Sequence, residues 1–223
     1  MYKGIIFDMD GVLINSEPLH CKAWIEVLAR YGVKLQEEEF KRFVGIPCEQ
    51  IRDYYLAKQE YSISPDVLNE KQEHYKIVEQ QELALMPGVK YLLNELINKH
   101  IPIAIASSSK HPDIRRCLKI TGALEYFHII CSGTDVAHTK PEPDLFLYTA
   151  KKMNLIPAEC IVIEDSVWGI MGAKKAGMHV CAYTSSHEKE VLLQAGADYV
   201  FDTFEKFNTD YINKLSYDNE VKS

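Results

Sequence analysis

Short apolar runs alternate with helical patterns from residue 89 to residue 201, and this alternation limits the folds open to the chain. The expected strands are residues 4–7, 101–106, 127–131, 160–163, 179–183 and 199–201, and the expected helices between them are residues 89–99, 112–121, 143–153, 167–176 and 188–195. Continuous apolar runs are typical of buried parallel strands, which need helical crossovers. We therefore predict an α/β fold, a doubly wound parallel sheet with helices on both faces.

Residues 15–85 interrupt the alternation with helical patterns alone. A helix start signal at Ser16 precedes apolar residues at helical spacing, and Gly32 ends that pattern. Further helices are expected over residues 37–44, 48–58 and 65–81. An insert after the first strand lies beside the carboxyl ends of the strands, where such sheets bind ligands. We predict a sheet domain of residues 1–14 and 86–223, and an inserted all-helical cap domain of residues 15–85 that is placed to act as a lid.

The composition argues against several classes of function. Lys and Arg number 25 against 32 Asp and Glu, a net charge of −7, and an acidic chain without a basic run matches neither nucleic acid nor an anionic membrane. No apolar run approaches the roughly 20 residues of a membrane helix, and the N-terminal run is too short for a signal peptide. The 6 cysteines are scattered, as is typical of reduced thiols. We expect a cytoplasmic protein that acts on a small molecule.

Charged and hydroxyl side chains follow the predicted strands where those strands end. In chain order they are Asp8 and Asp10, then Ser107, then Lys140, then Glu164 with Asp165. Because parallel strands end at one edge of the sheet, we expect these side chains to converge there. Clustered acids repel one another unless a cation lies among them, and carboxylate oxygens without His or Cys nearby suit Mg²⁺.

A magnesium site beside a lysine and a serine suits a phosphate group. The metal and the ammonium neutralise its charge, and hydroxyl and backbone N–H groups bind its oxygens. One carboxylate can then attack phosphorus and form an aspartyl phosphate. A second carboxylate can protonate the leaving oxygen and later deprotonate a water molecule.

These segments resemble four motifs of the haloacid dehalogenase superfamily, and in particular of its β-phosphoglucomutase-like group with a helical cap. The matching segments are residues 7–12 (FDMDGV), 106–107 (AS), 140–144 (KPEPD) and 164–166 (EDS), the last followed by Gly169, Ala173 and Gly177. The resemblance covers residues 3–201 and places each motif at a strand end. It implies a Rossmann-like core, a cap domain, Mg²⁺ as cofactor and a monomer.

The resemblance also implies roles for individual residues. Asp8 would be the nucleophile and Asp10 the general acid and base. Mg²⁺ would be held by the Asp8 and Asp165 side chains and the Asp10 carbonyl, with Glu164 beside it. Ser107 and Lys140 would bind the transferring phosphoryl group, helped by the backbone amides of Met9, Asp10 and Ser108. The Lys140–Pro141 peptide bond is expected to be cis.

In the cap and at its border, the resemblance points to substrate contacts by His20, Trp24, Lys71, Lys110 and His111. Plainer interpretations compete: Trp24 fits packing inside the cap, and Lys71 fits a solvated helix face. The phosphosugar mutases of this group carry a cap arginine shortly after a glycine, which clamps a second phosphate. Here Cys48 takes that place after Gly45 and Pro47, and Arg52 is the nearest substitute.

The favoured function is a Mg²⁺-dependent phosphatase that cleaves small phosphate monoesters, such as sugar phosphates, through an aspartyl phosphate. A β-phosphoglucomutase-type mutase is the alternative, which the missing arginine disfavours. A phosphonatase would require a Schiff-base lysine, for which Lys71 is the candidate. A phosphorylated-Asp signalling or interaction module without turnover would need neither Asp10 nor the cap. The physiological substrate is not readable from the sequence.

Overall fold

The computed structural model describes residues 2–43, 46, 48–58, 60–205, 207 and 211–212. The chain divides into two compact units, one of residues 1–14 and 85–223 and the other of residues 15–84. The prediction placed Leu85 in the insert. It groups with the first unit instead, because it forms an antiparallel bridge with Ile14 there.

The first unit is built on a parallel sheet of six strands in the order β3-β2-β1-β4-β5-β6. The strands are β1 (Gly4–Phe7), β2 (Ile103–Ser107), β3 (Ile129–Ser132), β4 (Cys160–Glu164), β5 (His179–Tyr183) and β6 (Tyr199–Phe201). Every residue of β1, β2 and β4 is buried, as expected of central parallel strands covered on both faces. The predicted α/β class is therefore confirmed.

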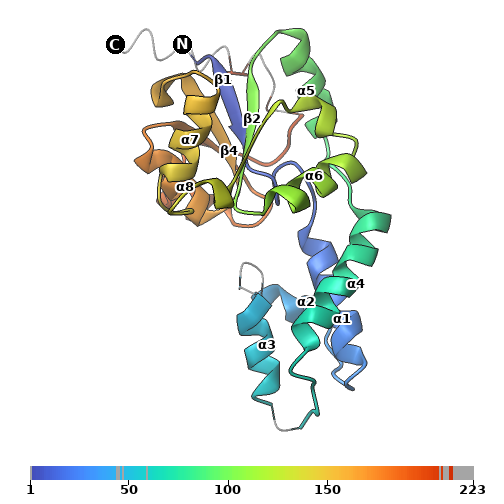
Figure 1. Cartoon of the computed structure of the whole chain (residues 1–223). Coiled ribbons are helices and arrows are strands. Elements are labelled where there is room, and N and C mark those ends of the chain that lie inside the picture. Colours follow the sequence, from blue (N-terminus) through green and yellow to red (C-terminus); the bar gives the residue numbers. More distant parts are fainter. Residues whose placement is uncertain are drawn as a thin grey trace. The chain divides into compact units, whose positions relative to one another are not determined.

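Helices cover both faces of this sheet. Its strand order runs outward from β1 to β3 and then reverses to β4, so right-handed crossovers place the helices before and after the reversal on opposite faces. The first set is α5 (Val89–Asn98) and α6 (His111–Ile120), and the second is α7 (Asp144–Lys152), α8 (Val167–Lys175) and α9 (Lys189–Gln194). Figure 1 shows α7 and α8 on one side of the strands and α5 and α6 on the other.

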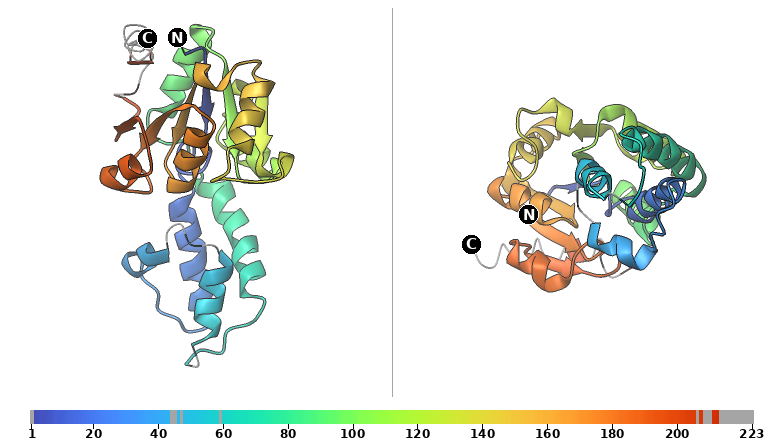
Figure 2. Two further views of the ribbon diagram at one scale, coloured as in Figure 1. Left: turned by 90° about the vertical axis from the view of Figure 1, so that its left-hand side faces the viewer. Right: turned by 90° about the horizontal axis from the view of Figure 1, so that it is seen from below.

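The regular elements among the described residues of the second unit are all helices. They are α1 (Glu17–Ala29), α2 (Glu37–Phe40), η1 (Lys41–Phe43), α3 (Cys48–Leu56) and α4 (Val67–Glu82). Helices α1 and α4 pack along each other (Figure 2). An apolar cluster that includes Trp24, Leu28, Phe40, Phe43 and Ile51 fills the interior of this unit. In either unit, none of the described helices is both long and apolar enough to cross a membrane.

Several element boundaries differ from the predicted ones. Strand β2 begins at Ile103 and β3 at Ile129, each two residues later than predicted, because the approach to each strand is irregular backbone. Short 3₁₀ helices were not predicted; they cover Leu124–Tyr126, Gly133–Asp135 and Pro157–Glu159. The predicted helix over residues 37–44 breaks into α2 and η1, and Val44, like Gly45 and Pro47, lies outside the described residues.

Candidate active site

Asp8 lies at the carboxyl edge of the sheet, directly after β1, one of its two central strands. Phe7, the last residue of β1, pairs with Ile105 of β2 and with Ile163 of β4, and Asp8 follows immediately. The backbone amide of Asp8 still donates to the Ile163 carbonyl, at 2.9 Å. The sheet therefore fixes the backbone that carries this carboxylate between the ends of two neighbouring strands.

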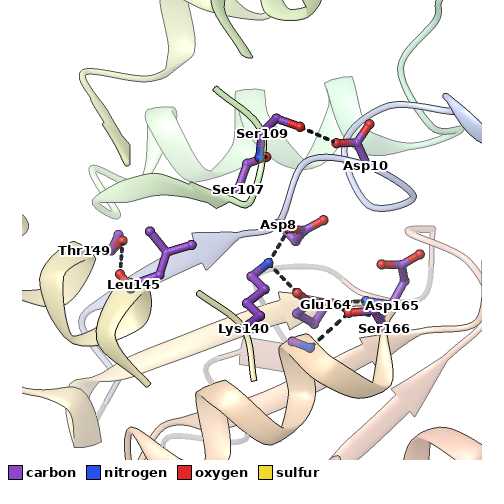
Figure 3. Close-up of polar contacts among 11 residues, drawn as sticks. Asp8, Asp10, Ser107, Ser109, Lys140, Leu145, Thr149, Glu164, Asp165 and Ser166 are labelled. Atoms are coloured by element: carbon purple, nitrogen blue, oxygen red, sulfur yellow. Dashed lines mark hydrogen bonds and ion pairs between the residues drawn. The ribbon is translucent and has the colours of Figure 1, made fainter. Parts of the chain in front are cut away.

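Lys140 enters from the loop before α7 and joins two of the acids. Its ammonium donates to Asp8 Oδ1 at 2.5 Å and to Glu164 Oε1 at 2.6 Å (Figure 3). Burial works against the charge of this side chain, but the two carboxylates outweigh it and raise the pKa of Lys140. Lys140 is thus a cation held against the acids. The predicted cis bond between Lys140 and Pro141 is confirmed.

Asp8 is an acid in an environment that disfavours its charge. Asp8 is 8% exposed, and burial raises the pKa of its carboxyl group well above the usual value. Glu164, Asp165 and Asp10 raise it further, and Lys140 opposes them. A carboxylate in this position is stabilised when an additional cation comes close to it.

Glu164 organises the loop between β4 and α8. Its Oε2 accepts hydrogen bonds from the backbone amides of Asp165 and Ser166 and from the Ser166 hydroxyl, each at 2.9 Å, while Oε1 accepts from Lys140. A Cβ atom on Gly169 would lie 1.7 Å from Glu164 Oε1, so the buried carboxylate occupies space that no other residue type would leave. Glu164 therefore holds Lys140 and the Asp165 backbone in place together.

Asp165 is the third buried acid, and its carboxyl meets a different set of partners. Its Oδ2 accepts from the hydroxyls of Ser185, at 3.0 Å, and Ser186. Burial, reinforced by the charge of Glu164, raises the pKa of Asp165 to about 7, although the two serines and Lys140 pull it down. Asp165 is therefore a carboxyl whose charge depends on pH near neutrality in the absence of a cation.

Asp10 lies on the turn after β1, near the end of β2. The Ser109 hydroxyl donates to Asp10 Oδ2 at 3.3 Å (Figure 3). The Ser107 hydroxyl accepts from the Ser109 amide at 3.1 Å and is buried. Since a hydroxyl that accepts a hydrogen bond keeps its own proton, Ser107 retains a donor for an incoming oxygen. The turn closed by the hydrogen bond from the Ser109 amide to the Ser107 hydroxyl is thus compatible with phosphate binding by Ser107.

The acids fit a magnesium ion. Asp8, Glu164 and Asp165 are all buried, and each offers a carboxylate oxygen, with these oxygens all within 4.8 Å of one another. Their donor set is oxygen alone, the preference of a hard divalent cation. Because Glu164 Oε2 already accepts three hydrogen bonds, Asp8 and Asp165 have the carboxylate oxygens that are freer to bind an ion.

Four other predicted residues, Met9, Ser108, Lys110 and His111, belong to the segments that follow β1 and β2. Met9 is buried, and its carbonyl accepts from the Leu13 amide at 2.9 Å. Ser108 and Lys110 are exposed. His111 begins α6, and its Nε2 lies 2.9 and 3.0 Å from the two carboxylate oxygens of Asp135. Substrate contacts by these residues remain predictions.

The remaining predicted residues, His20, Trp24 and Lys71, gather inside the helical unit. The Lys71 amine lies 2.6 Å from His20 Nδ1 and 3.6 Å from Cys48 Sγ, and the residue is 1% exposed. The interpretation of Lys71 as a solvated surface lysine is therefore wrong. Burial, with the nearby charge of Lys71, lowers the pKa of His20 to about 3, so His20 is neutral and accepts from the lysine. Trp24 is fully buried in the apolar cluster of this unit.

The sequence did not single out several side chains that hold the site. Ser109 contacts Asp10, and Ser185 and Ser186 contact Asp165. His187 Nδ1 also lies 3.2 Å from the Asp165 carbonyl. Their position in the sequence could have indicated a role, because residues 184–187 (TSSH) directly follow a predicted strand and so lie at the same edge of the sheet as the acids. Serines are common in any loop, so residue type alone did not distinguish them.

Comparisons with known proteins agree with this geometry. Residues 5–183 match the model of the haloacid dehalogenase-like hydrolase family. The fructose-1-phosphate phosphatase YqaB of Escherichia coli is 32% identical over 178 residues, which cover 79% of this chain and 94% of that protein. The β-phosphoglucomutase of Bacillus subtilis is 33% identical over 185 residues, which cover 79% of this chain and 80% of that protein.

Solved structures show the same fold. A crystal structure of a hydrolase of this family from Deinococcus radiodurans, with bound phosphate and sodium, has a TM-score of 0.83 at 26% sequence identity. The match covers 92% of this chain and 93% of that one. The family model spans most of the chain, and a carboxylate site lies at the edge of the sheet where the four motifs predicted it. The chain belongs to the haloacid dehalogenase-like hydrolases.

Proposed function

We propose that this protein is a magnesium-dependent phosphatase of small phosphate monoesters, with sugar phosphates as the substrate class. The observation that carries the proposal is the convergence of Asp8, Lys140 and Asp165 from separate parts of the chain on one buried edge of the sheet. Relatives that act on fructose 1-phosphate and other phosphorylated carbohydrates support the substrate class.

In the first half of the reaction, Asp8 attacks phosphorus in line with the leaving oxygen. The bond from phosphorus to that oxygen breaks, and a proton from Asp10 neutralises the departing alkoxide. Lys140 supplies a fixed positive charge to the phosphoryl oxygens, and the Ser107 hydroxyl donates to one of them. Asp8 now carries the phosphoryl group as a mixed anhydride.

In the second half, a water molecule replaces the departed alcohol. Asp10, now ionised, takes a proton from this water as its oxygen attacks phosphorus, and Asp8 is released as a carboxylate. Ser109, which donates to Asp10, would orient this carboxyl group in both halves. Inorganic phosphate then leaves, and the site returns to its starting state.

Asp8 and Asp165 would hold the magnesium ion, with the Asp10 carbonyl and Glu164 beside them. The ion would supply positive charge that neutralises the acids and the phosphoryl oxygens. Lys140 alone cannot neutralise three buried carboxylates. Burial first, and then the unneutralised charge of the neighbouring acids, raise the pKa values of Asp8 and Asp165.

Magnesium should stabilise the fold, and increasingly so as pH rises. Because folding raises the pKa of Asp165 to about 7, the metal-free folded state loses stability as pH climbs from about 4 through 7. Added metal at 100 times its Kd contributes about 2.7 kcal/mol, a rise in Tm of about 5–10 °C. Thermal unfolding in MgCl₂ and in EDTA at pH 8 and pH 5.5 measures this. Equal Tm values with and without Mg²⁺ at pH 8 would contradict the metal site.

The phosphatase activity is tested by phosphate release from a panel of substrates. Sugar phosphates, nucleotides, pyrophosphate and phosphonates are compared in the presence of Mg²⁺ and of EDTA. We expect turnover of sugar phosphates with magnesium and none with EDTA. Release from no monoester at all would overturn the proposal.

A β-phosphoglucomutase-type activity is the second candidate, which the relative from Bacillus subtilis favours. A mutase would interconvert hexose phosphates with a catalytic amount of hexose bisphosphate and release no net phosphate. Cys48 stands where the resemblance places a phosphate-binding arginine. The guanidinium of Arg52, the nearest substitute, is engaged by Asp53 at 2.8 Å. These two facts favour hydrolysis, and a coupled isomerase assay beside the phosphate assay separates the two activities.

The lifetime of the phosphoenzyme distinguishes a phosphorylated-Asp module without turnover from a phosphatase. If the protein were a signalling element, its phosphoenzyme would persist for hours, whereas a phosphatase intermediate decays within seconds.

We also infer a monomer that acts in the cytoplasm. All 6 cysteines are free thiols, as expected of a reducing compartment.

Lys71 is expected to select substrate at a cost in stability. Burial lowers the pKa of Lys71, because keeping its ammonium charged inside the unit destabilises the folded state. Lys71→Met removes this charge and should therefore raise the free energy of unfolding at pH 7. The same variant should lose about tenfold or more in kcat/KM for its sugar phosphate and keep its rate with an aryl phosphate. Lys76→Met, an exposed position on α4, is the matched control. Equal losses with both substrates would show that Lys71 has no role in selection.

A further inference from the structure

Three consecutive residues after β5 hold Asp165. The hydroxyls of Ser185 and Ser186 both reach Asp165 Oδ2, and His187 Nδ1 lies 3.2 Å from the Asp165 carbonyl. The side chain and the main chain of one acid are therefore gripped by one short loop of residues 185–187, here called the β5 loop. The reaction derived above uses none of these three residues.

The two oxygens of the Asp165 carboxylate have different surroundings. Oδ2 is enclosed, since a Cβ atom on Gly11 would lie 2.0 Å from it and 3.2 Å from Ser186 Oγ. The hydroxyl oxygens of Ser185 and Ser186 both lie within hydrogen-bond distance of this same oxygen. The carboxylate group is planar, so fixing Oδ2 against the β5 loop also fixes the direction in which Oδ1 points.

Ser185 makes a second connection, to the turn that follows Asp8. Its hydroxyl lies 2.6 Å from the Gly11 carbonyl and 3.0 Å from Asp165 Oδ2. One hydroxyl has one proton, so these two acceptors share it. Ser185 thus links the acid after β4 to the turn after β1 that carries Asp10.

We propose that Ser185 and Ser186 are positioning residues for the metal ligand Asp165: they occupy Oδ2 and present Oδ1 to the divalent cation. This role rests on the proposed magnesium site. Hydrogen bonds to a ligand from its outer partners fix its orientation, and their loss typically weakens metal binding by about 10–100-fold. Anchoring of the loop alone would affect stability and leave metal affinity unchanged.

The test is Mg²⁺ binding by isothermal titration calorimetry, without substrate, for the full chain. Ser185→Ala and Ser186→Ala should each raise the Kd about tenfold or more, and the double variant should raise it further. Ser186→Thr, which keeps the hydroxyl, should stay within about threefold of the wild type. Thr184→Ala is the matched control, because Thr184 lies in the same segment and makes no hydrogen bond to Asp165 among the described residues.

A second readout separates positioning from catalysis. In both alanine variants, the Mg²⁺ concentration for half-maximal rate should rise with the Kd, and kcat should recover at saturating Mg²⁺. Ser185 is exposed, so Ser185→Ala keeps the test valid if Ser186→Ala fails to fold. If the wild type binds Mg²⁺ and both Ser185→Ala and the double variant bind it equally well, the proposed role of the serines is overturned while the magnesium site stands. No binding by the wild type would overturn the magnesium site itself.

Discussion

Asp8→Asn should abolish turnover while leaving the fold intact. An amide cannot attack phosphorus as a carboxylate does, so the rate should fall at least about a thousandfold. Asn keeps the carbonyl oxygen that accepts from Lys140, and it removes a charge that burial disfavours. Steady-state phosphate release measures the loss. Thermal unfolding in EDTA should show a Tm no lower than that of the wild type.

The same variant decides whether Asp8 is the covalent nucleophile. Acid quenching of a reaction with labelled substrate should trap about one phosphoryl group per wild-type chain, sensitive to hydroxylamine, and none on Asp8→Asn. Asp113→Asn, on the surface of α6, is the matched control and should keep the wild-type rate. Label on Asp8→Asn at the wild-type level would assign the nucleophile to another residue. A wild-type phosphoenzyme that lasts for hours would favour the signalling alternative.

The acids of the site could be predicted from the sequence because they depend on a strong regularity. Parallel strands end at one edge, so a polar residue directly after an apolar run has a predictable location. Asp8 and Glu164 follow this rule most closely, since β1 and β4 are neighbours and their register is set by the fully buried pairs before them. The chemistry of an oxygen-rich, His-free cluster then points to a hard cation.

Contacts across the cap could not be predicted in the same way. Lys71 meets His20 because α1 and α4 pack along each other, and nothing in the two segments states that pairing in advance. A lysine within a largely polar helix is usually solvated, which is why the sequence left this interpretation open. The β5 loop has the same difficulty, because serine hydroxyls acquire a role only when the Asp165 carboxylate is known to face them.

Gly169→Ala should damage both stability and rate, although it adds only one methyl group at a residue that takes no part in the reaction. The added carbon would lie 1.7 Å from Glu164 Oε1 and 1.9 Å from its Cδ, so the carboxylate must leave its position. The buried amide of Asp165 and the part-buried amide of Ser166 would then lose their acceptor, at up to about 1–3 kcal/mol for each unsatisfied group. We expect a loss of at least about 3 kcal/mol in the free energy of unfolding, measured in urea.

The rate should fall with it, because Lys140 loses the partner that holds it beside Asp8. A displacement of about 1 Å costs on the order of a hundredfold in rate. Gly172→Ala is the matched control on α8: its Cβ would lie 3.2 Å from the Glu142 carbonyl and 3.3 Å from the Phe146 ring, contacts far milder than the 1.7 Å overlap at Gly169, and a gain in helix propensity of about 1 kcal/mol works against their cost. Wild-type stability and rate in Gly169→Ala would show that Glu164 does not organise the site.

Glu164→Asp combined with Gly169→Ala provides the sharper test. The shorter acid vacates the space that the new methyl group needs, so the double variant should regain part of the stability lost in Gly169→Ala alone. Its rate should stay low, because the withdrawn carboxylate no longer reaches Lys140. Recovery of stability without recovery of rate would separate the packing role of Glu164 from its electrostatic role, since only the latter depends on where the charge lies.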